Sequence, residues 1–369
     1  MKIRIQRTEL LRALYRVQGI IDRKLTTRAA AHVLVEANAD GLTVSATDSD
    51  LSLSGRYVAE VTEGGTITAH ARQLYDIVRS LSAEQVEIAS APQHWLHLRS
   101  GNSEFRVAGG PADEFPAIFE VESKKTLKLA AATLLQMIDR TLFCVSTDEN
   151  RHNLSGVFCE PLEGSRLRMI STDGHRLALA EGPTLAGDML TAGVLLPKKG
   201  LLESKRLLAE SHGEGEVALG VTEQGAVVRF GSVTLTTRLI ESKFPDYRQV
   251  IPQSSSKEAH IPRVAFVDAL KRVSLLSQSR TWGVRLSLSA DELTLEAEDP
   301  EHGDARETLA VRYQGDALRI GFNARYILDV LALMTGADVA FCLTDEHSPG
   351  VLKPADDGSF VSIVMPMRV

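Results

Sequence analysis

Apolar residues recur at helical spacing in six stretches of the chain. Leu10, Leu14 and Val17 share one face of the first stretch, and Phe266 and Leu270 share one face of the fifth. This pattern predicts helices over residues 8–21, 71–82, 133–146, 197–210, 264–277 and 323–336.

Between these stretches apolar and polar residues alternate, which is typical of β-strands. The clearest alternating segments are residues 42–46, 51–53, 86–88, 95–98, 105–107, 167–170 and 293–297. Turn-forming pairs such as Asp40-Gly41 and Gly101-Asn102 separate them. We therefore expect an α+β protein in which pairs of helices pack on one side of antiparallel sheets.

The predicted elements repeat three times along the chain. The second helix of each repeat begins one step of 126 residues after the last, at Ala71, Pro197 and Asn323. An acidic turn between the two helices recurs with nearly the same step, at residues 47–48, 172–173 and 298–299. A period this long corresponds to a small domain rather than to a solenoid unit of about 20–50 residues. We expect three tandem domains, over residues 1–122, 123–253 and 254–369.

Composition and cysteine usage predict a cytosolic protein without a membrane anchor. The 369 residues are 44% hydrophobic and 24% charged, as in ordinary globular proteins. The stretch after Met1 has no apolar signal-peptide block, and no apolar run reaches the roughly 18 residues of a membrane span. Cys144, Cys159 and Cys342 are odd in number and form no Cys-x-x-Cys pair, so we expect reduced thiols in the core.

The charge is unevenly distributed. The net charge of −7 argues by itself against a nucleic-acid binder. The six helix-like stretches nevertheless hold twelve Lys or Arg against seven acids, a charge of +5 that leaves −12 for the rest of the chain. Opposite charges on helices and strands suggest two faces with different surroundings, although a chance imbalance on solvated faces explains the count equally well.

No motif indicates catalysis. The chain has no phosphate-binding loop, no nucleophile elbow and no metal-spaced His or Cys set. Asp48-Ser49-Asp50 resembles the start of a calcium loop, but Leu53 stands where that loop requires glycine. Asp173 with His175 is the strongest enzyme candidate, and a tight turn at Asp173-Gly174 is the alternative. We expect no catalytic residue, no metal and no cofactor.

Four separated motifs resemble the bacterial β sliding clamp family, the processivity subunit of the replicative DNA polymerase III holoenzyme. They are Thr172-Asp173-Gly174-His175-Arg176-Leu177, Phe244-Pro245-Asp246-Tyr247-Arg248, Gly321-Phe322-Asn323 and Met365-Pro366-Met367-Arg368. Residues 282–286 also resemble the strand that opens the third domain of that family. The motifs occur in the family's order and span the whole chain, which makes the resemblance specific.

The resemblance implies a head-to-tail homodimer whose six domains form a ring around double-stranded DNA, with helices along the inner wall. Such a ring would contact phosphates without reading bases and would therefore slide. The candidate DNA-facing residues are the cations of the six helices, Arg12, Arg16, Arg72, Arg79, Arg140, Lys198, Lys199, Lys205, Arg206, Lys271, Arg272 and Arg325. Likeness to the family adds Arg23, Lys24 and His152.

The resemblance also implies a pocket for short apolar peptides. Its lining residues would be Leu154, Thr172, Gly174, His175, Arg176, Leu177, Pro245, Val250, Ile363, Met365, Pro366, Met367 and Arg368. Methionines adapt to different ligands, and Pro366 ends strand pairing, so a pocket is favoured over a core strand at Met365 and Met367. The implied subunit interface joins Phe105 and Val107 to Leu275 and Leu276 of the next subunit.

The implied partners are duplex DNA, a second copy of the chain, the replicative polymerase, clamp-loader subunits, translesion polymerases, mismatch-repair proteins and ligase. The implied location is the cytoplasm, at the nucleoid, with no membrane contact. Two other functions remain open at the level of sequence. One is a repeat scaffold that binds proteins but not DNA, and the other is a hydrolase that uses Asp173 and His175.

Overall fold

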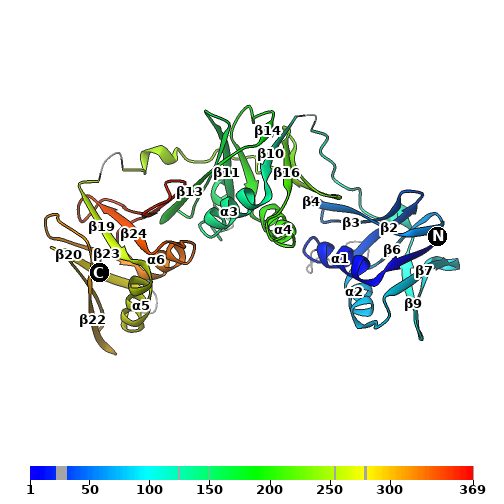
Figure 1. Cartoon of the computed structure of the whole chain (residues 1–369), viewed down its shortest axis with the longest axis horizontal. Helices are drawn as coiled ribbons and strands as arrows, with labels where there is room; N and C mark the ends of the chain where they lie inside the picture. The colour runs from blue at the N-terminus through cyan, green and yellow to red at the C-terminus, as the bar shows by residue number, and fades with distance from the viewer. Residues whose placement is uncertain (22–30, 124, 149, 253–254, 278–280, 369) are drawn as a thin grey trace. The chain divides into compact units, whose positions relative to one another are not determined.

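The structure, a computed structural model, describes residues 1–21, 31–123, 125–148, 150–252, 255–277 and 281–368 (Figure 1). This part of the chain contains the α-helices α1 Arg7–Val17, α2 Ala71–Ser80, α3 Ala131–Leu142, α4 Lys198–Ala209, α5 Arg263–Val273 and α6 Ala324–Leu331. All six predicted helices are confirmed, but each ends before the predicted stretch does. The fifth stretch continues as a separate 3₁₀ turn at Ser274–Leu276.

Side chains at the helix starts explain two of the boundaries. Asn323, predicted to be the first residue of a helix, is instead the N-cap of α6, where its side-chain oxygen accepts from the backbone N–H of Arg325 at 2.9 Å. His70 caps α2 in the same way, because its Nδ1 accepts from the backbone N–H of Gln73 at 3.3 Å. Both side chains satisfy donors that the first turn of a helix leaves unpaired.

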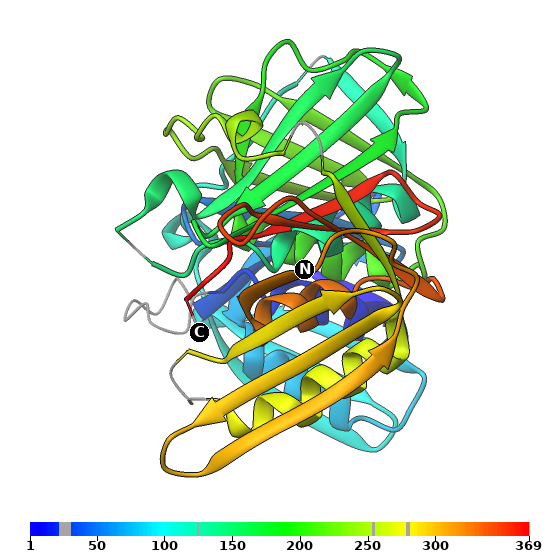
Figure 2. The same ribbon diagram turned by 90° about the vertical axis from the view of Figure 1, so that its left-hand side faces the viewer.

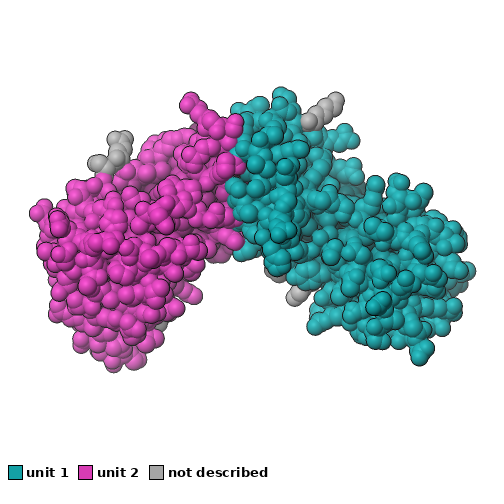
Figure 3. All heavy atoms as spheres, in the orientation of Figure 1, with its two compact units in different colours: residues 1–135, 184–191, 199–239 teal, residues 136–183, 192–198, 240–369 magenta. Residues whose placement is uncertain are grey.

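Contacts divide the described residues into two compact units, which Figure 3 distinguishes by colour. Unit 1 comprises residues 1–135, 184–191 and 199–239. Its strands form one antiparallel sheet in the order β14 Ala186–Gly187, β10 Thr126–Ala130, β16 Glu216–Val221, β17 Gly225–Phe230, β18 Val233–Arg238, β4 Leu51–Tyr57, β3 Gly41–Thr47, β2 His32–Asn38, β6 Gly65–His70, β9 Ser103–Gly110, β8 Trp95–Ser100, β7 Gln85–Ala91, β1 Lys2–Gln6 and β5 Glu60–Glu63. Helices α1 and α2 pack against each other in this unit.

Unit 2 comprises residues 136–183, 192–198 and 240–369 and contains two antiparallel sheets. The larger runs in the order β15 Val194–Pro197, β11 Gly156–Leu162, β12 Arg166–Thr172, β13 Arg176–Pro183, β26 Phe360–Val364, β25 Gly350–Pro354, β24 Asp338–Leu343 and β19 Lys257–Pro262. The smaller runs in the order β22 Gly303–Ala310, β21 Glu292–Asp299, β20 Gly283–Ser289 and β23 Leu318–Asn323. Figure 2 shows the long strands of this smaller sheet side by side, with α5 behind them.

The compact units differ from the three expected domains because sheets cross the expected boundaries. Strand β18 of the second repeat pairs with β4 of the first, from Val233 opposite Gly55 to Thr237 opposite Leu51. Strand β13 of the second repeat pairs with β26 of the third. Backbone hydrogen bonds therefore join consecutive repeats, and the boundaries near residues 122 and 253 stay predictions.

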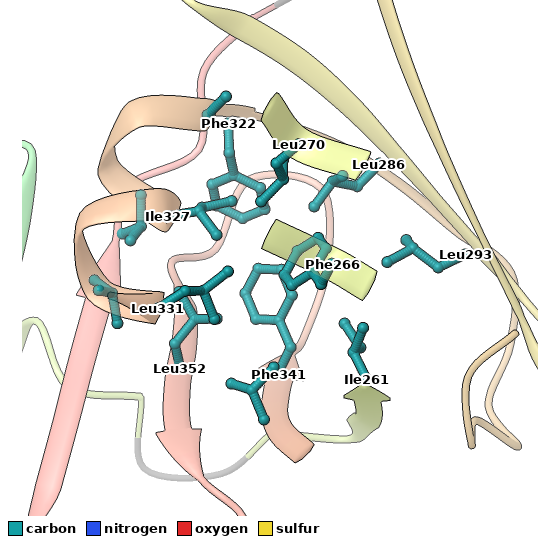
Figure 4. Packing of buried hydrophobic residues seen from close by; sticks show 14 of the residues in the cluster. Ile261, Phe266, Leu270, Leu286, Leu293, Phe322, Ile327, Leu331, Phe341 and Leu352 are labelled. Atoms are coloured by element: carbon teal, nitrogen blue, oxygen red, sulfur yellow. The ribbon is translucent and has the colours of Figure 1, made fainter. Parts of the chain in front are cut away.

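The core of the third repeat shows how the predicted apolar faces are used. Phe266 of α5, Phe322 of β23 and Phe341 of β24 are fully buried and meet between the helices and the sheets (Figure 4). The ring centroid of Phe341 lies 6.4 Å from that of Phe266 and 5.5 Å from that of Phe322. Leu270, from the same predicted helix face as Phe266, joins this cluster. Burial of such side chains, at about 2 kcal/mol each, is the main stabilisation of the fold.

Candidate functional site

Several helix cations of unit 1 are held by carboxylates of the same unit. Arg16 on α1 forms an ion pair with Glu210 at 2.8 Å and also donates to the hydroxyl of Tyr57. Burial lowers the pKa of Arg16, but the hydrogen bonds with Glu210 and Tyr57 outweigh burial and raise it. This guanidinium stays charged, yet much of its field is neutralised within the chain.

Two cations of α4 have similar partners. Arg206 pairs with Glu203 at 3.1 Å and lies over the ring of Tyr15, 5.5 Å from its centroid. Burial raises the pKa of Glu203 despite the neighbouring Arg206. Lys199 forms an ion pair with Asp48, the acidic turn of the first repeat. DNA phosphates would have to compete with these carboxylates for Lys199 and Arg206.

Arg140, one of the predicted DNA-facing residues, is only 7% exposed. Its guanidinium donates to Asp357 at 2.7 Å and to Ser359 at 2.9 Å, and it lies 5.1 Å from the centroid of the Phe360 ring. These contacts tie α3 to the turn before β26. Arg140 is therefore held inside unit 2 by partners that sequence spacing does not reveal, and its contact with DNA stays a prediction.

The other predicted DNA-facing residues differ in exposure. Those with exposed side chains are Arg12, Arg72, Arg79, His152, Lys271, Arg272 and Arg325, and those partly buried are Lys198 and Lys205. Arg12 pairs with Glu9 at 3.0 Å and Arg272 with Glu307 at 2.6 Å. Arg23 and Lys24 lie outside the described residues. Their DNA contacts stay predictions.

The acidic turn of the second repeat is built by Asp173. Its Oδ1 accepts from the backbone N–H groups of His175 and Arg176 at 2.9 and 3.0 Å, and Gly174, between Asp173 and His175, has a φ of +91°. The His175 ring stacks on Tyr326, with centroids 6.2 Å apart. Asp173 thus accepts from the backbone of His175 and closes a turn. This is the tight turn that the sequence offered as the alternative to a catalytic pair of Asp173 and His175.

Arg176 ties this turn to α6. Its guanidinium donates to Asp173 at 3.0 Å, to Asp329 at 2.7 Å and to the carbonyl oxygen of Phe143 at 3.1 Å. It also lies 4.5 Å from the centroid of the Tyr326 ring. Burial lowers the pKa of Arg176, but the surrounding acidic groups outweigh burial and raise it. With all these partners, Arg176 fixes the wall of the predicted pocket.

The predicted pocket residues divide into a buried floor and an exposed rim. Leu154, Leu177 and Ile363 are at most 7% exposed and belong to one apolar cluster. Val250 and Met365 are 39% and 38% exposed, high values for side chains of this size. Pro245, Gly174 and His175 are exposed as well, whereas Thr172, Arg176 and Pro366 are partly buried. Met365 is held beside the turn by a hydrogen bond from its backbone N–H to the carbonyl oxygen of His175 at 2.9 Å.

Two residues at the end of the predicted pocket lie in a different hollow. Met367 and Arg368 line a polar groove of about 750 Å³ on the smaller sheet of unit 2, together with Arg285 and Glu298. The backbone N–H of Met367 donates to the carbonyl oxygen of Gly321 on β23 at 2.9 Å. The tail after β26 therefore runs from the apolar rim to this charged groove.

The predicted interface residues also differ in exposure. Leu275, in the 3₁₀ turn after α5, is 80% exposed, and Leu276 is half-buried. Phe105 on β9 is half-buried, whereas Val107 is 3% exposed and belongs to the core of its own unit. Val107 therefore offers little surface to such an interface. A hollow of about 620 Å³ beside Phe105 is lined by His70, Arg72, Gln73, Asp76, Ile77 and Ser80.

Sequence reasoning missed a polar cluster beneath the pocket rim. Glu160 on β11 is 9% exposed and contacts Tyr247, Arg168 and Arg248. Tyr247 and Arg248 lie in the motif at residues 244–248, a signal that this segment is special. Nothing in the sequence marked Glu160, because glutamates in strands usually face solvent.

The described residues contain no group of three or more His, Cys, Asp or Glu side chains arranged to hold a metal ion. Cys144, Cys159 and Cys342 are free and buried, as expected. Burial raises the pKa of the Cys159 thiol to about 12, which keeps it protonated and unreactive. No described helix is long and apolar enough to cross a membrane.

Known proteins resemble the chain over its full length. Sequence profiles of the N-terminal, central and C-terminal domains of the DNA polymerase III beta subunit match residues 1–119, 128–246 and 248–368. The beta sliding clamp of Caulobacter vibrioides is 36% identical over 374 residues and that of Pseudomonas putida 36% over 372, with 100% of both chains covered in each case.

Solved structures agree with these matches. The crystal structure of the DNA polymerase III subunit beta from Pseudomonas aeruginosa is 35% identical, with a TM-score of 0.94 and 100% of both chains covered. The sliding clamp of Bartonella birtlesii, solved with griselimycin bound, is 30% identical with the same TM-score and coverage. Three matched domains in order and full-length identity above 30% leave one conclusion. The chain belongs to the bacterial DNA polymerase III β sliding clamp family, the non-catalytic processivity factors of that polymerase.

Proposed function

We propose that two copies of this chain join head to tail into a ring that encircles duplex DNA and keeps the replicative polymerase on its template. The single observation that carries the proposal is the full-length match to the family, with all three domains in order. Exposed cations on the helices, among them Arg79 on α2 and Lys271 on α5, support sequence-independent contact with phosphates. The proposed location is the cytoplasm, at the nucleoid.

The test is topological. A clamp loaded onto a nicked DNA circle by its clamp loader should co-elute with the circle in gel filtration and should leave it when a restriction enzyme linearises the DNA. Retention on linear DNA with free ends would contradict encirclement, and so would a failure to remain on the closed circle.

For ring closure we propose that Leu275 of one subunit enters the hollow beside Phe105 of the next. The lining of the hollow includes the apolar Ile77 and Phe105 and the charged Asp76 and Arg72. A small apolar centre with a charged rim suits an interface that a clamp loader must open.

For partner recruitment we propose that the apolar rim at Val250 and Met365 binds short, extended peptides. The partners would be the replicative polymerase, clamp-loader subunits, translesion polymerases, mismatch-repair proteins and ligase. Affinity in the micromolar range corresponds to roughly −8 kcal/mol, which a few buried apolar side chains can supply. Calorimetry with a polymerase-derived peptide should show a large loss of affinity for Met365→Ala combined with His175→Ala. Unchanged affinity of that double variant would remove the assignment.

A further inference from the structure

The segment that carries two rim residues of the peptide pocket is anchored by two buried aromatic side chains. Phe244 is 7% exposed and its ring stacks on Phe158, with centroids 5.2 Å apart and planes within 3°. Tyr247 is 3% exposed. Between and after these anchors the chain exposes Pro245 and Val250. The rim residues are thus placed by side chains that point inward.

The two anchors pack into the apolar cluster that forms the pocket floor. Phe244 and Tyr247 belong to the same cluster as Leu154, Leu177 and Ile363. In addition, the backbone N–H of Val250 donates to the carbonyl oxygen of Tyr247 at 3.1 Å. A shift of the Tyr247 backbone would therefore also move Val250.

The hydroxyl of Tyr247 is fixed by charged groups. It donates to Oε1 of the buried Glu160 and accepts from Arg168 at 2.8 Å. Arg168 also donates to Glu181 on β13 at 2.8 Å, and the other carboxylate oxygen of Glu160 accepts from Arg248 at 3.1 Å. Groups on two neighbouring strands, β11 and β12, thus contact the hydroxyl of Tyr247, and Glu181 on β13 holds one of them, Arg168.

A buried carboxylate is expensive unless several donors surround it, and removing one partner of such a network costs more than a surface pair would. Burial raises the pKa of Tyr247, so its hydroxyl remains protonated and able to donate to Glu160. The network fixes the position of the Tyr247 hydroxyl and pairs the exposed Arg248 with Glu160. Preorganisation of this kind favours binding because less freedom is lost when the ligand arrives.

We propose that Glu160 is a positioning residue for partner-peptide binding, which acts through the hydroxyl of Tyr247 to hold Val250 and Pro245 at the pocket rim. The inference rests on the proposed peptide pocket. It assigns a binding role to a carboxylate that lies beneath the rim segment and need not touch the peptide.

The test compares Tyr247→Phe and Glu160→Gln with the unmodified chain by calorimetry against a polymerase-derived apolar peptide. Each variant removes one part of the network and keeps the side chain's size, and each should weaken binding by about fivefold to tenfold. In a Val250→Ala background Tyr247→Phe should have a clearly smaller effect, because one of the two rim residues through which it acts has been truncated. Equal effects in both backgrounds would overturn the proposed route.

A loss of stability alone is separated from positioning by a core variant elsewhere in unit 2. Phe341→Leu belongs to the other apolar cluster and should lower the melting temperature without changing peptide affinity. If Phe341→Leu weakens binding as much as Tyr247→Phe does, the effect is general destabilisation and the inference is overturned. If Met365→Ala weakens binding but both network variants bind normally, this inference fails while the pocket stands. If Met365→Ala also binds normally, the pocket itself is refuted.

Discussion

Leu275 offers the sharpest test of ring closure. Its side chain is 80% exposed in the single chain and should become buried when the ring forms. Burying a leucine stabilises an interface by about 2 kcal/mol relative to alanine, and the hollow left empty adds about 1 kcal/mol. Because a closed ring of two subunits contains two such interfaces, Leu275→Ala should destabilise the dimer by about 4–6 kcal/mol. The dimer dissociation constant should rise by about 10³-fold to 10⁴-fold.

Sedimentation velocity or mass photometry over a dilution series measures this constant. Leu185→Ala is the matched control, since Leu185 is 54% exposed at the β14 end of the unit 1 sheet and lies outside the proposed interface. That control should dissociate like the unmodified protein. A dissociation constant for Leu275→Ala within roughly threefold of the unmodified value would refute the burial argument.

Three further outcomes are expected. Burial raises the pKa of Asp357, but hydrogen bonds from Ser359 and Arg140 outweigh burial and hold this pKa below its usual value. The Asp357 carboxylate therefore stabilises the folded protein above the ordinary aspartate pKa. This stabilisation is lost as pH falls through the lower pKa that Asp357 has in the folded state. Arg140→Met should therefore lower the melting temperature at neutral pH and flatten its decline below about pH 4, and a parallel decline would contradict this. Lys271→Glu should reduce the slope of DNA affinity against salt concentration by about one unit in a titration of fluorescent duplex, and an unchanged slope would place Lys271 off the DNA. Gly174→Ala should lower the free energy of unfolding in urea by about 1–2 kcal/mol, because the φ of +91° at this position is strained for any residue with a Cβ; an unchanged midpoint would show that the turn relaxes freely.

Local pattern was enough to predict the helices and many strands, because one buried face per element leaves a periodic signature. Residues 42–46 lie in β3 and residues 293–297 in β21, as the alternation indicated. Pairing between repeats left no such signature. Strand β18 meets β4 from about half of the chain length away, and backbone hydrogen bonds of this kind form with almost any side chains on either strand.

The site was predicted less completely for a related reason. The sequence shows where a cation stands but not which acidic residue it pairs with. Arg140, which pairs with Asp357, and Arg79, which is exposed on α2, therefore could not be distinguished. The motif at residues 244–248 marked Tyr247 without showing what it touches. Glu160 was invisible because its three cationic and phenolic contacts come from other parts of the chain.

The pairing of β18 with β4 has a consequence for anyone who divides this protein into pieces. A fragment that begins after residue 122 would lose β4 and leave Val233–Arg238 as an open ladder of unsatisfied N–H and C=O groups. Such edges invite association with any other exposed strand. Single repeats cut at the limits of the three matched domains should therefore aggregate or exchange strands. A soluble fragment would need to keep each shared sheet whole.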